Sequence, residues 1–374
     1  MTKKVLIFSI SYYPFVGGAE VAVRQITDRL PETDWQMLTL SHDSVLPKHE
    51  QIGNIKVTRV RCPKIFSPFV LAWYGHQLHK KENFDVVWSI MSFAGFAGLF
   101  LKILKPRIKF LLTLQEGTPT SELKRKTFLA YPLFVLMFKK ADMIQAISEF
   151  LAAFGRDMGH TRPIQIIPNG VDVSLFSKVF TPSERAETEK ILGKKNGDIF
   201  LVTSSRLTYK NAIDDIINAL KNLPENISLI VIGKGEQGCS LQRQVDCLGL
   251  QSRVKFLGFV PQNDIPKYFS VCDIFVRPSR SEGFGNSFIE AMAAKLPVIA
   301  TPIGGIPDFI DDRETGIFCS PDNPQSIVLA VKTLVENPKL RDHIVALAFQ
   351  RVSDRYSWNL IAKEMKTKVF DTIL

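Results

Sequence analysis

The chain of 374 residues has few of the residues that build disulfide frameworks or metal centres. Its five cysteines are scattered, odd in number and never in Cys-x-x-Cys spacing. This excludes a disulfide scaffold or a cysteine-based zinc site and favours a reducing cytoplasm. Among the six histidines, only His76 and His79 approach metal-ligand spacing, and their helical pattern favours a solvated face. We therefore expect no metal site.

Long apolar runs are also absent. The longest, Val86–Leu101, spans 16 residues and is interrupted by serines and glycines, whereas a membrane-spanning helix needs about 20 apolar residues. It predicts a strand, a loop and a buried helix. The N-terminus looks superficially like a signal peptide, but its apolar part is only Val5–Ile10 and no small-residue cleavage site follows. A buried first strand is the favoured interpretation.

The positive charge is unevenly distributed. The net charge is +10; residues 1–172 hold 22 Lys and Arg against 14 Asp and Glu, and residues 173–374 hold 25 against 23. Within 101–140 alone there are nine basic and two acidic residues. One face of the first half is thus expected to meet an anionic partner. Nucleic acid is disfavoured, because no recognised binding module accompanies the charge.

Strand-like and helical patterns alternate along the whole chain. Near-continuous apolar runs such as 5–10, 86–90, 199–205 and 227–233 are typical of parallel strands buried on both faces. The alternation predicts an α/β protein with two doubly wound, Rossmann-like domains, and the length agrees with two cores.

The expected domain boundary follows a turn-forming segment. Ile167–Asp172 has turn chemistry and precedes a polar stretch rich in lysine and glutamate. We expect domains at residues 1–170 and 171–356. Residues 357–374 read as an amphipathic helix, and crossing back to the first domain would bury its apolar face.

Two short motifs lie where strands end. Gly17 and Gly18 follow the first strand and open a helix, where backbone N–H groups and the helix dipole can hold an anion; a turn needed only for chain geometry is an equal alternative. Arg206 and Lys210 follow the first strand of the second domain and could neutralise a pyrophosphate. The alternative for this pair is two solvated surface charges.

The third motif, SEGFGNSFIEAMA at 281–293, is the most informative. Glu282 lies in a Gly-x-Gly loop and Glu290 in the first turns of the following helix. Carboxylates accept hydrogen bonds from vicinal hydroxyls, so the pair suits ribose and hexose. Favourable interaction of helix N-terminal acids with the dipole explains Glu290 in part, but not the whole set. Gly233 and Gly304 belong to further loops after strands.

Together the ordered segments GGAE, SRLTYK, GKGE, RPSRSEGFGNSFIEAMA and PVIATPIGGIPD resemble glycosyltransferase family 4. These are retaining enzymes of the GT-B fold, with two Rossmann-like domains facing a central cleft. The resemblance covers nearly the whole chain. It implies an acceptor-binding first domain, a second domain that binds a nucleotide diphosphate sugar, and no cofactor or metal.

The resemblance also implies residue roles. Gly17 and Gly18 would face the donor phosphates and the acceptor. Arg206 and Lys210 would stabilise the departing diphosphate, Glu282 would meet sugar hydroxyls, and Glu290 would bind the ribose diol. Other donor contacts would come from Gly233, Phe284, Gly285 and Asn286, the last three through backbone groups. Fixed positive charge at the leaving group stabilises the transition state and so accelerates such a reaction.

One position departs from the family pattern. Many members carry Thr-x-His-Asp at the end of a first-domain strand, whereas this chain has Gln115 and Glu116 after Thr113. Gln115 cannot carry a proton. Glu116 is a candidate catalytic substitute, and a structural role for it is the alternative.

A basic and apolar segment suggests membrane contact. Phe128–Phe138 is intensely apolar and is bracketed by five basic residues: Lys124, Arg125, Lys126, Lys139 and Lys140. Such brackets fit an interfacial element on an anionic leaflet; a buried helix with charged ends is the alternative. We expect a cytoplasmic protein, peripheral on the inner face of the membrane.

The combined prediction is a retaining hexosyltransferase. Its partners would be a nucleotide-sugar donor, a glycan or lipid-linked acceptor and an anionic membrane surface, in the synthesis of cell-surface polysaccharide or glycolipid. A nucleotide-sugar epimerase of the same fold and a non-catalytic sugar-nucleotide or membrane-binding module are the alternatives, since fold alone does not decide function.

Overall fold

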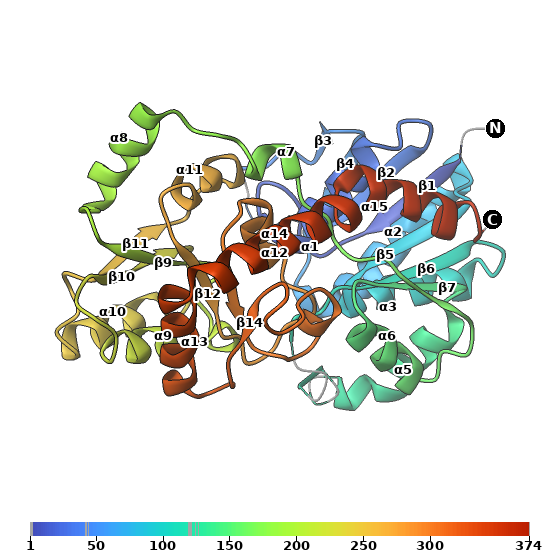
Figure 1. The fold of residues 1–374 in the computed structure, drawn as a ribbon. Coiled ribbons are helices and arrows are strands. Elements are labelled where there is room, and N and C mark those ends of the chain that lie inside the picture. Colours follow the sequence, from blue (N-terminus) through green and yellow to red (C-terminus); the bar gives the residue numbers. More distant parts are fainter. Residues whose placement is uncertain are drawn as a thin grey trace. The chain divides into compact units, whose positions relative to one another are not determined.

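The computed structural model describes residues 3–41, 43, 45–118, 122–123, 125 and 127–373. The chain forms two compact units (Figure 1). Unit 1 comprises Met1–Gly170 and Trp358–Leu374, and unit 2 comprises Val171–Ser357. Each unit has its own sheet and its own hydrophobic core.

Unit 1 is built on an eight-stranded sheet of order β3-β4-β2-β1-β5-β6-β7-β8. Every pairing is parallel except the antiparallel edge pair β3·β4. The strands are β1 (Lys4–Phe8), β2 (Asp34–Leu40), β3 (His49–Ile52), β4 (Ile55–Val60), β5 (Val86–Ile90), β6 (Lys109–Leu114), β7 (Met143–Ala146) and β8 (Ile164–Ile166). β5 is buried along its whole length, which explains its uninterrupted apolar sequence.

Helices cover both faces of this sheet. They are α1 (Gly18–Asp28), α2 (Ser67–Glu82), α3 (Met91–Leu104), α5 (Tyr131–Lys140), α6 (Glu149–Asp157) and α15 (Trp358–Glu364), with short turns η1 (Lys64–Phe66) and η2 (Phe128–Ala130) and the π-helical η6 (Met365–Phe370). On one face α1 packs against α15, and Phe370 makes edge-to-face contacts with Trp35 and Trp88. On the other face α2 packs on α3, and α3 packs on α5.

Unit 2 has a six-stranded, fully parallel sheet of order β11-β10-β9-β12-β13-β14. Its strands are β9 (Ile199–Ser204), β10 (Ile227–Ile232), β11 (Val254–Gly258), β12 (Ile274–Arg277), β13 (Val298–Ala300) and β14 (Ile317–Phe318). The first strand lies in the middle, so the strand order reverses between β9 and β12. Ligands of open α/β sheets bind outside the carboxyl ends of the strands at such a reversal.

Of the helices of unit 2, two precede the first strand and the others follow the strands. They are α7 (Val173–Phe176), α8 (Pro182–Leu192), α9 (Ile213–Leu220), α10 (Gly238–Cys247), α11 (Ile265–Phe269), α12 (Asn286–Ala293), α13 (Pro324–Glu336) and α14 (Pro338–Arg355), with turns η3 (Tyr209–Asn211), η4 (Gln262–Asp264) and η5 (Ile306–Asp308). The core of this unit joins the apolar faces of α9, α10 and α13 to the sheet.

Several sequence predictions are confirmed. Both units are doubly wound α/β structures, the N-terminal run forms the buried strand β1, and Val86–Leu101 divides into β5 and the largely buried α3. Within the described residues, no helix is both long and apolar enough to cross a membrane.

Candidate functional site

The loop after β9 carries two cationic side chains at the reversal of strand order. Arg206 is exposed and Lys210 is half-buried. The buried Asn211 holds the loop from inside, because its Nδ2 donates to the carbonyl oxygen of Arg206 at 2.6 Å and to Oγ1 of Thr208 at 3.4 Å. Ala212 then adopts a left-handed conformation with φ of 53° and leads into α9. The loop therefore has a defined shape that presents both cations.

Lys210 lies in a positively charged environment. Burial lowers the pKa of its ammonium group to about 8, and the positive charges of Arg277 and Arg206 add to this effect. Its Nζ is 4.0 Å from Oε1 of Glu282. Because cations crowd this position, an anionic ligand would relieve their repulsion and restore the lysine's ordinary affinity for a proton.

The loop after β12 is organised around a buried arginine. Arg277, the last residue of β12, forms an ion pair with Glu282 and donates to Oγ of Ser287 at 2.6 Å and Oγ of Ser279 at 3.1 Å. Its guanidinium also lies 4.8 Å from the ring centroid of Phe288. Burial lowers its pKa to about 10, so it stays charged at neutral pH. Arg277 thus fixes the Glu282 carboxylate, and the sequence analysis did not identify it.

Glu290 is buried in the first turns of α12. Its Oε1 accepts a hydrogen bond from Nε2 of Gln262 at 2.9 Å. Burial raises the pKa of Glu290 to about 7, although the Gln262 hydrogen bond and the charge of Arg277 act in the opposite direction. The Glu290 carboxyl group can therefore accept a hydrogen bond from a ligand hydroxyl in place of the one from the Gln262 amide.

The N-terminus of α12 adds backbone donors to the site. Gly285 precedes the helix with φ of 95°, and Asn286 is its first residue. The side chain of Phe284 is buried against Phe309 and Tyr356, so only its backbone is available to a ligand. The positive end of the α12 dipole therefore lies beside the loop that carries Glu282, which favours bound anions.

Two glycines permit the neighbouring loops to pack directly on the site. A Cβ on Gly233, which has φ of 136°, would lie 1.9 Å from the carbonyl oxygen of Ser205. A Cβ on Gly304, which has φ of 55°, would lie 1.8 Å from the carbonyl oxygen of Glu282. Gly233 was expected from the sequence to bind the donor. The structure shows that a side chain at this position would clash with the backbone of Ser205, and a side chain at Gly304 would clash in the same way with the backbone of Glu282.

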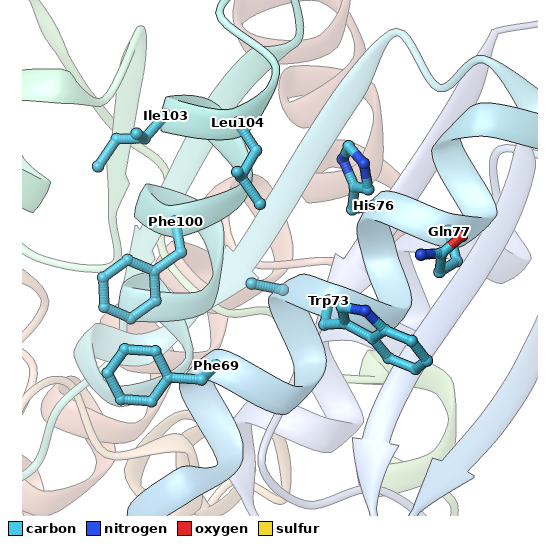
Figure 2. A pocket seen from close by; sticks show the side chains of 8 residues that line it. Phe69, Trp73, His76, Gln77, Phe100, Ile103 and Leu104 are labelled. Carbon is cyan, nitrogen blue, oxygen red and sulfur yellow. The ribbon is translucent and has the colours of Figure 1, made fainter.

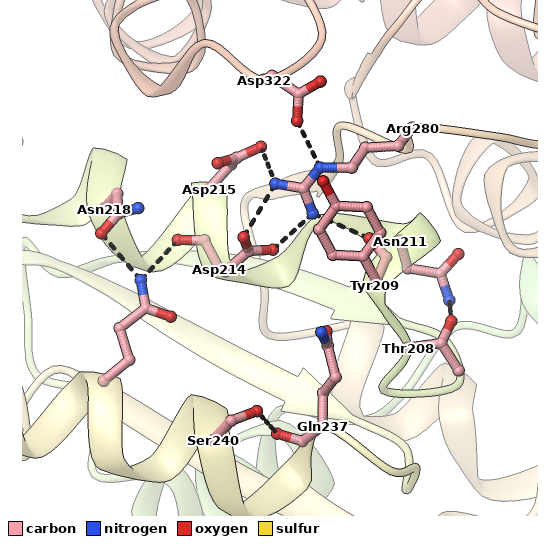
Figure 3. A network of polar contacts seen from close by, with 11 residues as sticks. Thr208, Tyr209, Asn211, Asp214, Asp215, Asn218, Gln237, Ser240, Arg280 and Asp322 are labelled. Carbon is pink, nitrogen blue, oxygen red and sulfur yellow. Dashed lines mark hydrogen bonds and ion pairs between the residues drawn. The ribbon is translucent and has the colours of Figure 1, made fainter.

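A second arginine that the sequence analysis did not single out, Arg280, ties the two loops together (Figure 3). Its backbone N–H donates to the carbonyl oxygen of Lys210 at 2.7 Å, and its Nη1 donates to that of Tyr209 at 2.9 Å. The guanidinium lies over the Tyr209 ring and pairs with two acids at the start of α9, Asp214 and Asp215, and with Asp322. These partners raise the pKa of Arg280 above its usual value despite burial.

Two of the expected site residues of unit 1, Gly17 and Glu116, have hydrogen-bond partners within that unit. The N–H of Gly17 donates to Oε2 of Glu20 at 2.8 Å, immediately before Gly18 begins α1. Glu116 is buried, and its Oε1 accepts hydrogen bonds from N and Oγ of Ser92 in the first turn of α3. Burial raises the pKa of Glu116. This contact favours the structural alternative for Glu116, a carboxylate at a helix N-terminus.

The structure therefore brings eight expected residues to the carboxyl edge of the unit 2 sheet: Arg206, Lys210, Gly233, Glu282, Phe284, Gly285, Asn286 and Glu290. Gly17, Gly18 and Glu116 belong to unit 1. In the part of the chain that the structure describes, no group of three or more His, Cys, Asp and Glu side chains could hold a metal ion.

The expected membrane-contact residues are only partly covered by the structure. Arg125, Lys139 and Lys140 are exposed, and Lys124 and Lys126 lie outside the described residues. The apolar segment between them combines both sequence interpretations. Phe134, Met137 and Phe138 are buried, whereas Phe128, Leu129, Tyr131 and Leu133 are exposed.

Comparison with known protein families gives two matches. Residues 184–351 match the family of glycosyl transferases group 1, and residues 16–175 match Glycosyltransferase Family 4. An uncharacterised glycosyltransferase of Methanocaldococcus jannaschii is 26% identical over 379 residues, covering 96% of each chain. A GDP-mannose-dependent phosphatidylinositol monomannoside mannosyltransferase of Mycolicibacterium smegmatis is 27% identical over 229 residues, covering 58% of this chain and 59% of the relative.

Solved structures share the fold. The crystal structure of HepE from Anabaena in complex with UDP and glucose superposes with a TM-score of 0.84 at 22% identity, covering 99% of this chain and all of that one. The expected fold class, two Rossmann-like α/β domains of the GT-B type, is confirmed.

Proposed function

The chain belongs to glycosyltransferase family 4, the group 1 glycosyl transferases, and from this we propose that it is a retaining hexosyltransferase. It takes the sugar from a nucleoside diphosphate sugar bound in unit 2. It transfers that sugar to a glycan or lipid-linked acceptor at a membrane surface, in the synthesis of cell-surface polysaccharide or glycolipid.

The observation that carries this proposal is the meeting of two charge pairs at one edge of the unit 2 sheet. Arg206 and Lys210 come from the loop after β9, and Glu282 and Glu290 come from the loop and helix after β12. The cations suit a diphosphate and Glu290 suits a ribose diol. The HepE complexes with UDP and glucose and with UDP-glucose support a nucleotide-sugar donor for this chain.

The proposed chemistry requires no protein nucleophile. The bond between the sugar C1 and the leaving phosphate oxygen breaks, and the acceptor oxygen bonds to C1 on the same face. The acceptor proton passes to an oxygen of the departing diphosphate. Arg206, Lys210 and the N-terminus of α12 stabilise the negative charge that develops there. We propose that this fixed positive charge replaces a divalent metal and that no cofactor is needed.

A thermal-shift screen against UDP-, GDP- and ADP-sugars tests the donor, in the presence of EDTA. A ligand at 100 times its dissociation constant adds about 2.7 kcal/mol to the free energy of unfolding. One nucleotide class should therefore raise the unfolding midpoint by several degrees. Lack of any shift with all three would contradict the proposal, and a shift that requires added metal would contradict metal independence. Release of an altered free nucleotide sugar without acceptor would indicate an epimerase instead.

The acceptor is proposed to lie at an anionic membrane. The support is the exposed apolar side chains of η2 and α5 beside exposed basic residues, together with a relative named for transfer to a phosphatidylinositol mannoside. Each lysine or arginine near an anionic surface contributes about 1 kcal/mol. The protein would thus be peripheral on the cytoplasmic face, and Lys124 and Lys126 would add to the contact.

Vesicle sedimentation tests the proposed membrane contact. Phosphatidylglycerol vesicles at low salt should deplete the protein from solution. Replacing Lys139 and Lys140 with serine should weaken binding about tenfold or more. The matched control is Lys332→Ser, an exposed lysine on α13 of unit 2. Equal binding of all three proteins would remove α5 from the proposed contact.

A further inference from the structure

Unit 1 carries an open apolar groove between α2 and α3 that the proposed transfer reaction does not use (Figure 2). Its volume is about 520 Å³. α2 contributes Phe69, Trp73 and His76, and α3 contributes Phe100, Ile103 and Leu104. The Phe69 and Phe100 rings stack with centroids 4.6 Å apart, which forms one wall of the groove.

The lining is unusually exposed for such large side chains. Phe69, Trp73, Ile103 and Leu104 each keep more than half of their surface accessible to solvent. Phe66 precedes α2 and is exposed to the same degree. Contiguous apolar surface of this kind on a globular protein marks a binding site for a protein, a membrane or a ligand.

The charge around the groove is mainly positive. The sequence contains no Asp or Glu between Glu50 and Glu82, nor between Asp85 and Glu116. Glu82 pairs with Lys4 at 2.8 Å, and Asp85 accepts the backbone N–H of Lys4 at 2.9 Å, so both acids have partners on β1. The surface formed by α2 and α3 therefore offers positive charge to a partner.

The positive charge is concentrated at one end of the groove. Lys80 lies one helical turn after His76 on α2, and Lys105 directly follows Leu104, the last residue of α3. Burial lowers the pKa of the His76 imidazole, and the charges of Lys80 and Lys105 add to this effect. His76 lines the groove, whereas Phe69 and Phe100 line its apolar wall. The groove is thus amphipathic along its length, apolar at the phenylalanine pair and basic beyond His76.

We propose that this groove binds the hydrocarbon chain of an anionic membrane lipid, with the headgroup phosphate at Lys80 and Lys105. The inference deepens the membrane contact proposed above and rests on it for its cellular setting. Charge complementarity selects this occupant. A second copy of the chain would bring an equally basic surface against this one, and such like-charge contacts are unfavourable.

The location agrees with the rest of unit 1. α2, α3 and α5 pack side by side on one face of the sheet. The exposed apolar residues of η2 and α5 therefore belong to the same helical layer as the groove. Aromatic and basic side chains on one layer are typical of an interfacial element.

The tryptophans of the chain give a direct experiment. Of the four, Trp35, Trp88 and Trp358 are at most 3% exposed, whereas Trp73 is 56% exposed and lines the groove. Vesicles of phosphatidylglycerol with brominated acyl chains quench only a tryptophan that approaches the hydrocarbon. They should quench the protein, and Trp73→Phe should lose this quenching. Vesicles of brominated phosphatidylcholine should quench much less, and inorganic phosphate should have no effect.

The headgroup contact is tested by a double variant. Replacing Lys80 and Lys105 with serine should weaken binding to phosphatidylglycerol vesicles about tenfold or more, whereas Lys332→Ser should bind like the wild type. The nucleotide-sugar thermal shift serves as the check of folding. It also separates the two proposals, because it reports unit 2 and should be unchanged in every one of these variants.

Three results would overturn the inference. One is vesicle binding without quenching of Trp73, which would place the lipid elsewhere. Another is equal quenching by the two lipids with no effect of the lysine changes, which would remove the headgroup site. The third is burial of Trp73 that depends on protein concentration without lipid, which would assign the groove to a second copy.

Discussion

Arg277 ends β12 and Arg280 follows it three residues later, and their side chains stabilise different parts of the site. Arg277 points into the core and fixes Glu282, whereas Arg280 binds the backbone of the loop that carries Lys210. Neither role could be predicted from the sequence. The partners of Arg280 at Asp214 and Asp322 are 66 and 42 residues away in the chain, so only the folded sheet brings them together.

We predict that Arg280 acts on the reaction through Lys210. Arg280→Ala should lower kcat about tenfold or more, because the loop loses its anchor, and Arg280→Lys should restore little, because a lysine cannot pair with three carboxylates. The measurement is a double-mutant cycle with Lys210→Ala. The effect of Arg280→Ala should nearly vanish in that background, whereas additive effects would show that Arg280 acts elsewhere.

A second prediction concerns the buried carboxyl group of Glu290. Its pKa of about 7 exceeds the ordinary value of 4.5, so the folded state binds a proton that the unfolded state releases. Ionisation of Glu290 therefore destabilises the fold increasingly as pH rises from about 4.5 to 7, by about 3 kcal/mol at most. Glu290→Gln should unfold at higher urea than the wild type at pH 8, and this difference should shrink at pH 5.

The same variant should bind the donor more weakly, because an amide accepts fewer hydrogen bonds from a diol than a carboxylate does. Glu187→Gln, at an exposed position of α8, is the control and should change neither quantity. A Glu290→Gln variant that is less stable at pH 8 than the wild type would contradict this account of the site.

At the scale of elements, continuous apolar runs predicted strands well and mixed patterns did not. β1, β5 and β9 are buried on both faces and were recognised from sequence. β4 was missed because its lysine and threonine alternate with buried apolar residues, as expected of a strand close to the sheet edge. α14 was missed because only Ile344, Ala348 and Val352 of its 18 residues are buried, which leaves a weak apolar stripe.

The candidate site, like the secondary structure, could be predicted only in part. Motif residues at strand ends identified the two loops, because parallel strands bring their carboxyl ends to one edge. The loop contacts that set their geometry could not be predicted, since they depend on close approach between segments far apart in sequence. Gly304 is the clearest example of such a contact. Only glycine fits at this position, because a Cβ would clash with the backbone of Glu282.

The loop packing leads to a third prediction. Gly304→Ala should both destabilise the fold and weaken donor binding, because the new Cβ would displace the loop of Glu282. The matched control is Gly193→Ala, which has a similar positive φ of 74° but no atom within 4 Å of the new Cβ. That control should cost about 1 kcal/mol from backbone strain alone and leave donor affinity unchanged. Equal effects of the two changes on donor affinity would refute the packing explanation.

At the scale of the whole molecule, the two units differ in where their charged and apolar side chains gather. Unit 2 concentrates cations and carboxyl groups at the reversal of its strand order, whereas unit 1 concentrates exposed apolar and basic side chains on the helical layer of α2, α3 and α5. The excess of basic residues in the first half, visible in the sequence, follows this division.

Calorimetric titration tests most directly whether the loop after β9 holds a diphosphate. The nucleoside diphosphate chosen by the thermal-shift screen is titrated into the wild type, Lys210→Ala and Lys332→Ala. We predict that Lys210→Ala binds at least about tenfold more weakly, as expected for a lost charge-assisted contact, and that Lys332→Ala binds like the wild type. Equal affinity of the Lys210→Ala variant and the wild type would contradict the account.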